Sequence, residues 1–369
     1  MQRPQLNKTM NFIDLKAQQN RIKEKIDTNI SKVLAHGDYI MGPEVGELER
    51  CLAKYVGVKH CIGVSSGSDA ILIAMMALKI GPGDEVITTT FSFIAAAEMI
   101  KLLGAKPVFI DIDRQTYNID SKKISASITK KTKLIIPVSL FGQCSDMDAI
   151  NMIAKHNNIP VLEDGAQSFG ATYKKSKSCS LSEIGITSFF PSKPLGGYGD
   201  GGAIFTNNDF LAKEMRNISL HGQSKRYRHS RLGINGRLDT IQAAILLAKF
   251  EIFSDEVIRR NEIGEQYTSH INLVNTAIKT PKIQFNCTTV YAQYSILVEN
   301  REKLIVKLRK IGIPTAVHYP IPLHLQPVFS NNRGIFSVAE SVSEKILSLP
   351  MHPYLSIEDI QRVSQALAG

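Results

Sequence analysis

Residues 147–168 have the sequence MDAINMIAKHNNIPVLEDGAQS. We expect a helix over 147–156 and an apolar strand over 159–163. The segment before them, 134–139, is apolar throughout, as in a strand that is buried on both faces of a sheet. A strand, a helix and a second strand in this order predict two parallel strands with a helix packed across them. Polar residues follow the second strand directly, at the edge where open α/β sheets bind ligands.

The same alternation extends toward the N-terminus. Strands are expected at 60–64, 85–89 and 107–112, and helices at 68–79 and 94–103. Apolar residues in 68–79 recur at three- and four-residue spacing, and a Gly-Pro-Gly turn follows. The pattern predicts an α/β fold with a mainly parallel sheet that helices cover on both faces.

The last third of the chain has a different pattern. A long helical stretch begins at residue 243 and continues, with an interruption, to residue 270. The later elements are one strand and three helices, expected at 291–298, 301–310, 339–347 and 357–367. We therefore predict a large α/β domain over 10–255 and a smaller C-terminal α+β domain over 256–369.

The composition is that of an ordinary globular protein. Hydrophobic residues make up 43% and charged residues 21% of the 369 residues, which excludes a disordered chain, a collagen-like repeat and a disulfide-rich miniprotein. With 44 Lys and Arg against 34 Asp and Glu, the net charge is +10. This charge favours an anionic partner: a nucleic acid, an acidic membrane surface or a phosphorylated small molecule. The composition does not choose among the three.

The cysteines and the apolar segments indicate a cytoplasmic protein. The 5 cysteines form no C-x-x-C pair and are odd in number, so we expect reduced thiols and no zinc site. The N-terminus carries no apolar signal sequence, and the apolar stretches are far too short to span a membrane.

Three polar clusters, 65–69, 164–168 and 188–193, fall at the carboxyl ends of expected strands. The small residues of 65–69 precede a helix, where free N–H groups bind phosphate, although Ser and Asp are also common helix caps. Asp164 could pair with a cation or could be a solvated loop acid. Taken singly, these residues do not separate a binding site from an ordinary loop.

Lys193 lies among apolar residues before a glycine-rich turn. A lysine that is partly removed from water has a lowered pKa and acts as a nucleophile toward aldehydes, although most lysines lie on the surface. The glycines of 197–202 match the dinucleotide-binding pattern G-x-G-x-x-G. We reject this match because residues 203–206 resemble a strand, and the pattern needs a following helix.

Two further polar segments are ambiguous from their residues alone. The segment 221–237 carries several Lys, Arg and His residues, which could form a nucleic-acid site, a mobile loop that meets a diphosphate or carboxylate, or a solvated loop. His318, Tyr319 and His324 lie in an apolar, proline-rich segment. No spacing there supports a metal site, and a single His is more often structural than a ligand.

Together, the order and spacing of these motifs resemble the DegT/StrS family, the sugar-nucleotide branch of the fold-type I aminotransferases that use pyridoxal phosphate (PLP). The resemblance covers about residues 12–363. Its anchors are GDYIMGP (37–43), SGSDA (66–70), GPGDEV (81–86), EDGAQ (163–167), the Lys193 segment, GINGR (233–237) with QAA (242–244), and HYP (318–320).

The resemblance implies a cofactor site. Lys193 would bind PLP covalently, and Asp164 would pair with the ring nitrogen and keep it protonated, so that the ring can accept electrons. Gln167 would hydrogen-bond the phenolic oxygen. Phe93 would stack on the ring, with Phe91 as the alternative.

The resemblance also places the cofactor phosphate. Gly67, Ser68 and Ser188 would hold it, together with Asn235 of the partner subunit, which makes a homodimer with shared active sites the functional unit. The sequence departs from the family at Ser68, where Thr is frequent but the hydroxyl is kept, and at Ala96, where Thr is common.

The implied reaction has two halves. Glutamate would donate its amino group and leave as 2-oxoglutarate, and a keto-sugar nucleotide would then accept the amine. Lys193 would move the proton between the donor's Cα and the cofactor. A dehydratase subgroup of the family has His in place of this lysine, so Lys193 favours transamination.

The sequence is most similar to the branch that acts on UDP-linked 3-oxo uronic acids. We therefore expect amination of UDP-2-acetamido-2-deoxy-3-oxo-D-glucuronate at carbon 3, for surface-polysaccharide biosynthesis. Arg237 of the partner subunit would bind the uronate carboxylate, and His318 and Tyr319 would contact the sugar nucleotide. The alternatives are another UDP- or dTDP-linked 3-keto or 4-keto sugar, a non-catalytic PLP-binding regulator, and a nucleic-acid-binding protein, for which no binding module is recognisable.

Overall fold

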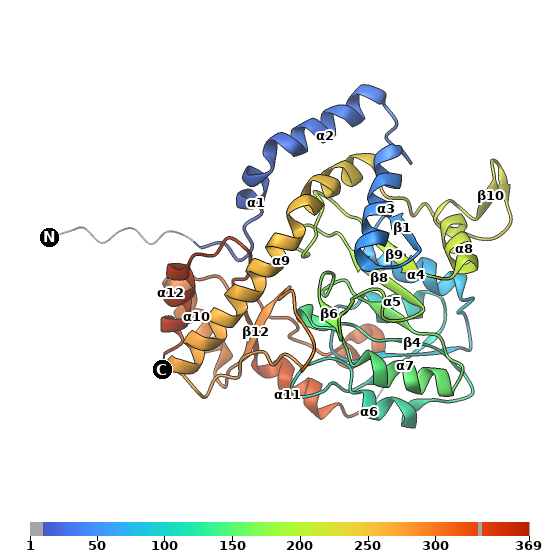
Figure 1. Cartoon of the computed structure of the whole chain (residues 1–369). Helices are drawn as coiled ribbons and strands as arrows, with labels where there is room; N and C mark the ends of the chain where they lie inside the picture. The colour runs from blue at the N-terminus through green and yellow to red at the C-terminus, as the bar shows by residue number, and fades with distance from the viewer. Residues whose placement is uncertain (1–9, 331–333, 369) are drawn as a thin grey trace.

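A computed structural model of the protein describes residues 10–330 and 334–368 (Figure 1). Within these residues, seven strands form a central sheet in the order β3-β2-β4-β5-β8-β9-β1. Two parallel bridges, Ile135 to Val161 and Val138 to Asp164, join β3-β2-β4 to the other four strands. The bounds of the seven are β1 (His60–Val64), β2 (Glu85–Thr89), β3 (Lys106–Ile110), β4 (Thr132–Ile136), β5 (Leu162–Asp164), β8 (Ile184–Ser188) and β9 (Gly202–Thr206).

The remaining described elements are helices and short strand pairs. The helices are α1 (Leu15–Arg21), α2 (Lys23–His36), α3 (Pro43–Val56), α4 (Gly67–Ala77), α5 (Ala95–Leu102), α6 (Ser121–Ile124), α7 (Met147–His156), α8 (Asp209–Ser219), α9 (Thr240–Val274), α10 (Arg301–Lys310), α11 (Ser337–Lys345) and α12 (Ile357–Ala366). The strand pairs are β6 (Thr172–Tyr173) with β7 (Ser176–Lys177), β10 (Gln223–Lys225) with β11 (Arg228–His229), and β12 (Tyr294–Leu297) with β13 (Ile346–Leu349).

Neighbouring strands of the central sheet run parallel except at β9, which is antiparallel to both β8 and β1. The predicted mainly parallel sheet is therefore confirmed. The rejection of a dinucleotide fingerprint is also confirmed, because the glycines of 197–202 lead into β9 and not into a helix. The parallel strands bring their carboxyl ends to one edge of the sheet, where ligands bind in such folds.

Alternate residues along each strand point to two different cores. On one face, Ile62 and Ile204 pack with α4, α5 and α8. On the other face, Cys61 and Phe205 pack with α3 and α9. Helices therefore cover both faces, which explains why the strands are apolar throughout.

The helix α9 is one continuous element of 35 residues that contributes to two cores (Figure 1). Phe253 packs beneath the central sheet, whereas Ile263 and Tyr267 join a second core with β12, β13, α10 and α12. The predicted interruption is wrong, because polar side chains in the middle have partners: Glu256 accepts a hydrogen bond from Gln18 at 2.8 Å. The division of the chain at residue 255 stays a prediction.

One boundary near the C-terminus also differs from the prediction. The helix expected at 339–347 ends at Lys345, and the apolar run that follows forms β13. β13 pairs antiparallel with β12, so its buried side chains complete the second core. Among the described residues, no helix has the length and apolar character that a membrane crossing requires.

The close approach of β8 to residue 179 generates the first prediction. Gly185 lies in β8, and a Cβ added there would overlap the backbone of Cys179. We expect Gly185→Ala to lower the free energy of unfolding by about 1–3 kcal/mol, because the backbone must shift to admit the methyl group. The shift of the urea unfolding midpoint measures this loss.

Gly81→Ala is the matched control, because a Cβ at this turn glycine meets no heavy atom within 4 Å. Its effect should stay within about 0.5 kcal/mol. Equal shifts for the two variants would contradict the packing argument.

Candidate active site

A cavity of about 530 Å³ opens at the carboxyl ends of the central strands. Side chains from β5, the end of β8, the start of α4 and the segment before residue 320 line it. It brings together nine of the eleven predicted site residues: Gly67, Ser68, Phe93, Asp164, Gln167, Ser188, Lys193, His318 and Tyr319. Asn235 and Arg237 do not line the cavity of their own chain.

Asp164 is the last residue of β5, and its carboxylate lies at the floor of the cavity. Its Oδ1 accepts a hydrogen bond of 3.0 Å from the backbone N–H of Ala166. Burial raises the pKa of Asp164, while this hydrogen bond and the positive charge of Lys193 act in the opposite direction. A cation in the cavity would favour the ionised carboxylate further.

Lys193 reaches the same cavity from the loop between β8 and β9. Burial lowers the pKa of the Lys193 amine, and the charge of Asp164 opposes this effect. The loop is tightly turned, since the N–H of Lys193 donates to the carbonyl of Phe190 at 2.8 Å and the N–H of Gly197 donates to that of Phe189 at 2.7 Å. Lysine and aspartate thus share one partly desolvated space.

A second lysine, which the sequence analysis missed, supports this loop from below. Lys249 of α9 is buried, and its Nζ donates to the carbonyl of Gly196 at 2.7 Å and lies 4.3 Å from the centre of the Tyr198 ring. Gln242 accepts a hydrogen bond from the backbone N–H of Tyr198 at 2.9 Å. A lysine inside an otherwise apolar helical run was the only signal in the sequence.

The N-terminus of α4 forms a cradle for an anion. Ser66 caps the helix by accepting the N–H of Asp69 at 2.9 Å, and Gly67 and Ser68 place the first two N–H groups at the open start of the helix. A Cβ at Gly67 would lie 2.8 Å from the Cβ of Ser188, so only glycine lets the end of β8 approach this closely. Ser68 and Ser188 line the same cavity. The cradle fits the phosphate of the predicted cofactor.

Gln167 and Tyr319 form the opposite wall. The Gln167 side chain accepts the N–H of Phe141 at 3.0 Å and donates to the Tyr319 hydroxyl at 3.3 Å. Burial raises the pKa of Tyr319, so the phenol keeps its proton. An amide nitrogen has two hydrogens, and the second can reach an oxygen in the cavity.

The two phenylalanines considered for ring stacking have different surroundings. Phe93 is 56% exposed and lines the cavity. Phe91 is fully buried and packs edge-on against the Tyr319 ring at 6.2 Å. Phe93 therefore has a free ring face for a planar ligand, as the prediction requires, and Phe91 has none.

His318 lines the cavity with a constrained ring. Its Nδ1 lies 2.9 Å from the Ser348 hydroxyl, and the Phe12 ring lies 6.2 Å away. Burial lowers the pKa of His318, and the positive charge of Lys193 lowers it further. Among the described residues, no group of three or more His, Cys, Asp or Glu side chains could hold a metal ion.

Asn235 and Arg237 lie at the same end of the sheet but outside the cavity. The carbonyl of Gly236 accepts the N–H of Ser65 at 3.2 Å, which ties this segment to the end of β1. Asn235 is exposed. The Nε of Arg237 is buried and has no hydrogen-bond partner among the described residues. The β10–β11 hairpin before this segment is exposed and projects from the body of the molecule (Figure 1).

Comparison with known proteins shows which family has this fold and sequence. The sequence model of the DegT/DnrJ/EryC1/StrS aminotransferase family matches residues 20–368. The chain belongs to this family. The predicted family and the prediction of an aminotransferase are thus confirmed, and the roles of the individual site residues stay predictions.

Several relatives match over nearly the whole chain. The UDP-2-acetamido-2-deoxy-3-oxo-D-glucuronate aminotransferase of Pseudomonas aeruginosa is 55% identical over 97% of this chain and 99% of its own. A pleiotropic regulatory protein of Geobacillus stearothermophilus is 44% identical over 97% of each chain.

Solved structures of the family have the same fold. A Brucella abortus aminotransferase superposes with a TM-score of 0.94 at 42% identity, covering 97% of this chain and 98% of its own. A Bacillus subtilis protein with bound cofactor PMP superposes with a TM-score of 0.92 at 32% identity, covering 99% of this chain and 86% of its own. The predicted fold-type I architecture is confirmed.

The buried Lys249 predicts a pH dependence of stability. Burial lowers its pKa from 10.5 to about 8 in the folded protein. Between these pH values the unfolded chain binds more protons, so this lysine makes the free energy of unfolding rise with pH. Lys249→Met lacks this contribution. We expect the native protein to gain stability relative to the variant between pH 8 and pH 10.5, as measured by urea unfolding.

Lys213→Met, which removes an exposed lysine of α8, is the control for this comparison. If the native protein gained as much stability with pH relative to Lys213→Met as relative to Lys249→Met, the gain would not come from the buried Lys249.

Proposed function

We propose that the protein transfers an amino group from glutamate to carbon 3 of UDP-2-acetamido-2-deoxy-3-oxo-D-glucuronate. The observation that carries this proposal is the 55% identity, over nearly the full length of both chains, with the Pseudomonas aeruginosa enzyme of that name. The cavity supports it, because it presents a lysine amine, a carboxylate and an anion cradle together.

The predicted cofactor, pyridoxal phosphate, is confirmed by structures of relatives that hold PLP or its aminated form. In this chain, Gly67, Ser68 and Ser188 would hold the phosphate, and Asp164 would pair with the ring nitrogen. Bound PLP supplies an electron sink that makes the Cα–H bond of an amino acid acidic.

Lys193 performs the proton transfer. Its lowered pKa increases the share of neutral amine near neutral pH, so Nζ can accept the proton from Cα of the amino donor and later return one. Asp164 would stabilise the positive charge on the ring nitrogen in both half-reactions. Gln167 and Tyr319 wall the cavity and limit access of water from their side.

A homodimer with shared active sites completes this proposal. Asn235 is exposed and lies outside its own cavity, so it is free to reach the phosphate in a second copy. Apolar side chains at this end of the molecule are also exposed: Ile40 is 52%, Phe190 50% and Leu232 87% exposed. A second copy would cover such residues. A cytoplasmic location is consistent with the free state of all five cysteines.

Arg237 supports the choice of a uronate as substrate. A carboxylate is the acceptor that a guanidinium binds in bidentate geometry. In the dimer, Arg237 of the partner subunit would meet the sugar carboxylate, while His318 and Tyr319 line the cavity around the sugar nucleotide.

A substrate panel tests the proposed reaction. The purified protein is incubated with glutamate and a set of keto-sugar nucleotides, and mass spectrometry detects the aminated product. We expect turnover of the 3-oxo uronate. Lys193→Ala should abolish turnover and the near-violet absorbance of covalently bound PLP.

Turnover of a neutral 4-keto sugar without turnover of the uronate would contradict the proposed substrate. A native protein that binds no PLP and shows no near-violet band would instead support a regulatory role.

The role of Arg237 gives a second test. Arg237→Gln removes the charge, so kcat/KM for the uronate should fall about 10- to 100-fold, because a hydrogen bond to a charged group contributes about 1.5–3 kcal/mol. The neutral counterpart with a hydroxymethyl group in place of the carboxylate should lose little. Arg228→Gln, in the exposed β11, is the matched control. An equal loss of kcat/KM for both sugars would mean that Arg237 does not bind the carboxylate.

A further inference from the structure

His324 joins two parts of the chain that approach the cavity from different directions. The segment 318–325 carries His318 and Tyr319 into the cavity and then crosses to the end of β2. There the N–H of Leu323 donates to the carbonyl of Thr90 at 2.7 Å. The Nδ1 of His324 lies 2.6 Å from the Thr90 hydroxyl. The segment is therefore fixed to Thr90 by one main-chain and one side-chain hydrogen bond.

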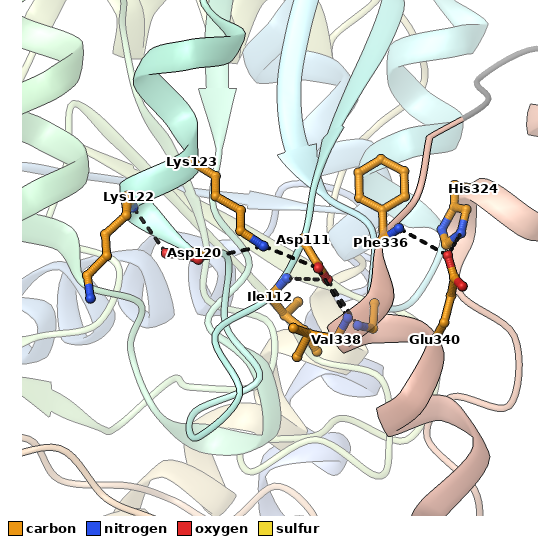
Figure 2. Close-up of polar contacts among 10 residues, drawn as sticks. Asp111, Ile112, Asp120, Lys122, Lys123, His324, Phe336, Val338 and Glu340 are labelled. Atoms are coloured by element: carbon orange, nitrogen blue, oxygen red, sulfur yellow. Dashed lines mark hydrogen bonds and ion pairs between the residues drawn. The ribbon is translucent and has the colours of Figure 1, made fainter.

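The other ring nitrogen of His324 contacts the start of α11. Its Nε2 lies 3.1 Å from Oε1 of Glu340, which also accepts the N–H of Phe336 at 3.0 Å, as Figure 2 shows. The His324 side chain is 2% exposed, whereas the Glu340 carboxylate is 39% exposed and remains open to water on its outer side. A carboxylate oxygen accepts hydrogen bonds, so Nε2 is the donor toward Glu340. In the tautomer with its hydrogen on Nε2, Nδ1 accepts from the Thr90 hydroxyl.

The helix α11, which carries Glu340, is held against the central sheet by a further contact. Asp111, just after β3, accepts the N–H groups of Val338 at 3.2 Å and Ala339 at 2.9 Å, which holds the first turn of α11 against the sheet (Figure 2). Lys123 pairs with the same carboxylate at 3.3 Å. His324 thus connects the end of β2, through Thr90, with the start of α11, through Glu340. One orientation of its ring makes both contacts.

The bridge affects the residues that line the cavity. Thr90 begins the turn that carries Phe91 and Phe93, and the Tyr319 ring packs against both, at 6.2 Å and 6.4 Å between ring centres. Holding Thr90 to His324 therefore sets the distance between this turn and Tyr319. On its other side, Tyr319 meets Gln167.

We infer that His324 is a positioning residue for the second substrate. Its bridge between Thr90 and Glu340 aligns His318 and Tyr319 for the sugar nucleotide. The inference rests on the proposed function, since it takes these two residues as the sugar contacts. Lys193 and Asp164, which the proposed function uses in both half-reactions, come from other segments than His324, Thr90 and Glu340.

The two half-reactions provide the test, because each changes the absorbance of the bound cofactor and can be followed in single turnovers of the holoenzyme. We expect His324→Ala to raise the sugar-nucleotide concentration needed for half-maximal rate about tenfold, the effect of losing buried hydrogen bonds. The glutamate half-reaction should change less than twofold. Thr90→Val should reproduce this split, and Thr90→Ser should restore the native values.

Further variants separate positioning from general damage. The double variant His324→Ala with Thr90→Val should lose no more than either single variant, because both remove the same bridge. His156→Ala, which removes an exposed histidine of α7, should alter neither half-reaction. Cofactor absorbance and the thermal midpoint establish that each variant is folded.

Three outcomes would overturn the inference: equal losses in both half-reactions, no loss in either, or additive losses in the double variant. If the native enzyme aminates a different keto sugar, the proposed substrate is wrong. The two half-reactions are then compared with the accepted sugar, and a loss confined to the sugar half-reaction still supports the role of His324.

Discussion

The active site depends on two opposite charges that share a partly desolvated cavity. Burial pushes Lys193 toward the neutral amine and Asp164 toward the neutral acid, while their mutual attraction opposes both shifts. The roles proposed for the two residues, proton transfer for Lys193 and charge stabilisation for Asp164, both depend on this balance. The parallel strands make it possible, because they end at one edge and deliver both side chains there.

The surroundings of this pair are correspondingly rigid. Glu163, the residue before Asp164, points away from the cavity, and its buried carboxylate accepts hydrogen bonds from Ser178 at 2.7 Å and from the N–H of Cys179 at 2.8 Å. Burial raises the pKa of Glu163 to about 7. Because neighbouring strand residues face opposite sides, fixing Glu163 also fixes Asp164.

Local patterns in the sequence predicted most of the fold, whereas the site roles of the nine lining residues were predicted from the resemblance to a known family. A polar cluster that follows an apolar strand can be recognised from its own short stretch of sequence. Asp164 and Lys193 could therefore be singled out as candidates without knowing how close they lie in space. The predicted break in α9 failed for the opposite reason, since the partner of Glu256 is Gln18, 238 residues away.

The supporting contacts could not be predicted for the same physical reason. The hydrogen bond from Lys249 to Gly196 spans 53 residues, and that between His324 and Thr90 spans 234. Nothing in a local pattern distinguishes these side chains from structural ones. Asn235 and Arg237 differ from these, because the family resemblance predicted them and their proposed targets belong to another copy of the chain.

The continuity of α9 has a consequence for how the protein unfolds. At about 1.5 Å per residue, a helix of 35 residues is roughly 50 Å long, and its two halves pack in different cores. Loss of either core would leave half of this helix without the packing that stabilises helices in water. We therefore expect the two cores to unfold as one cooperative unit, and partial unfolding to be confined to segments outside them, such as the β10–β11 hairpin.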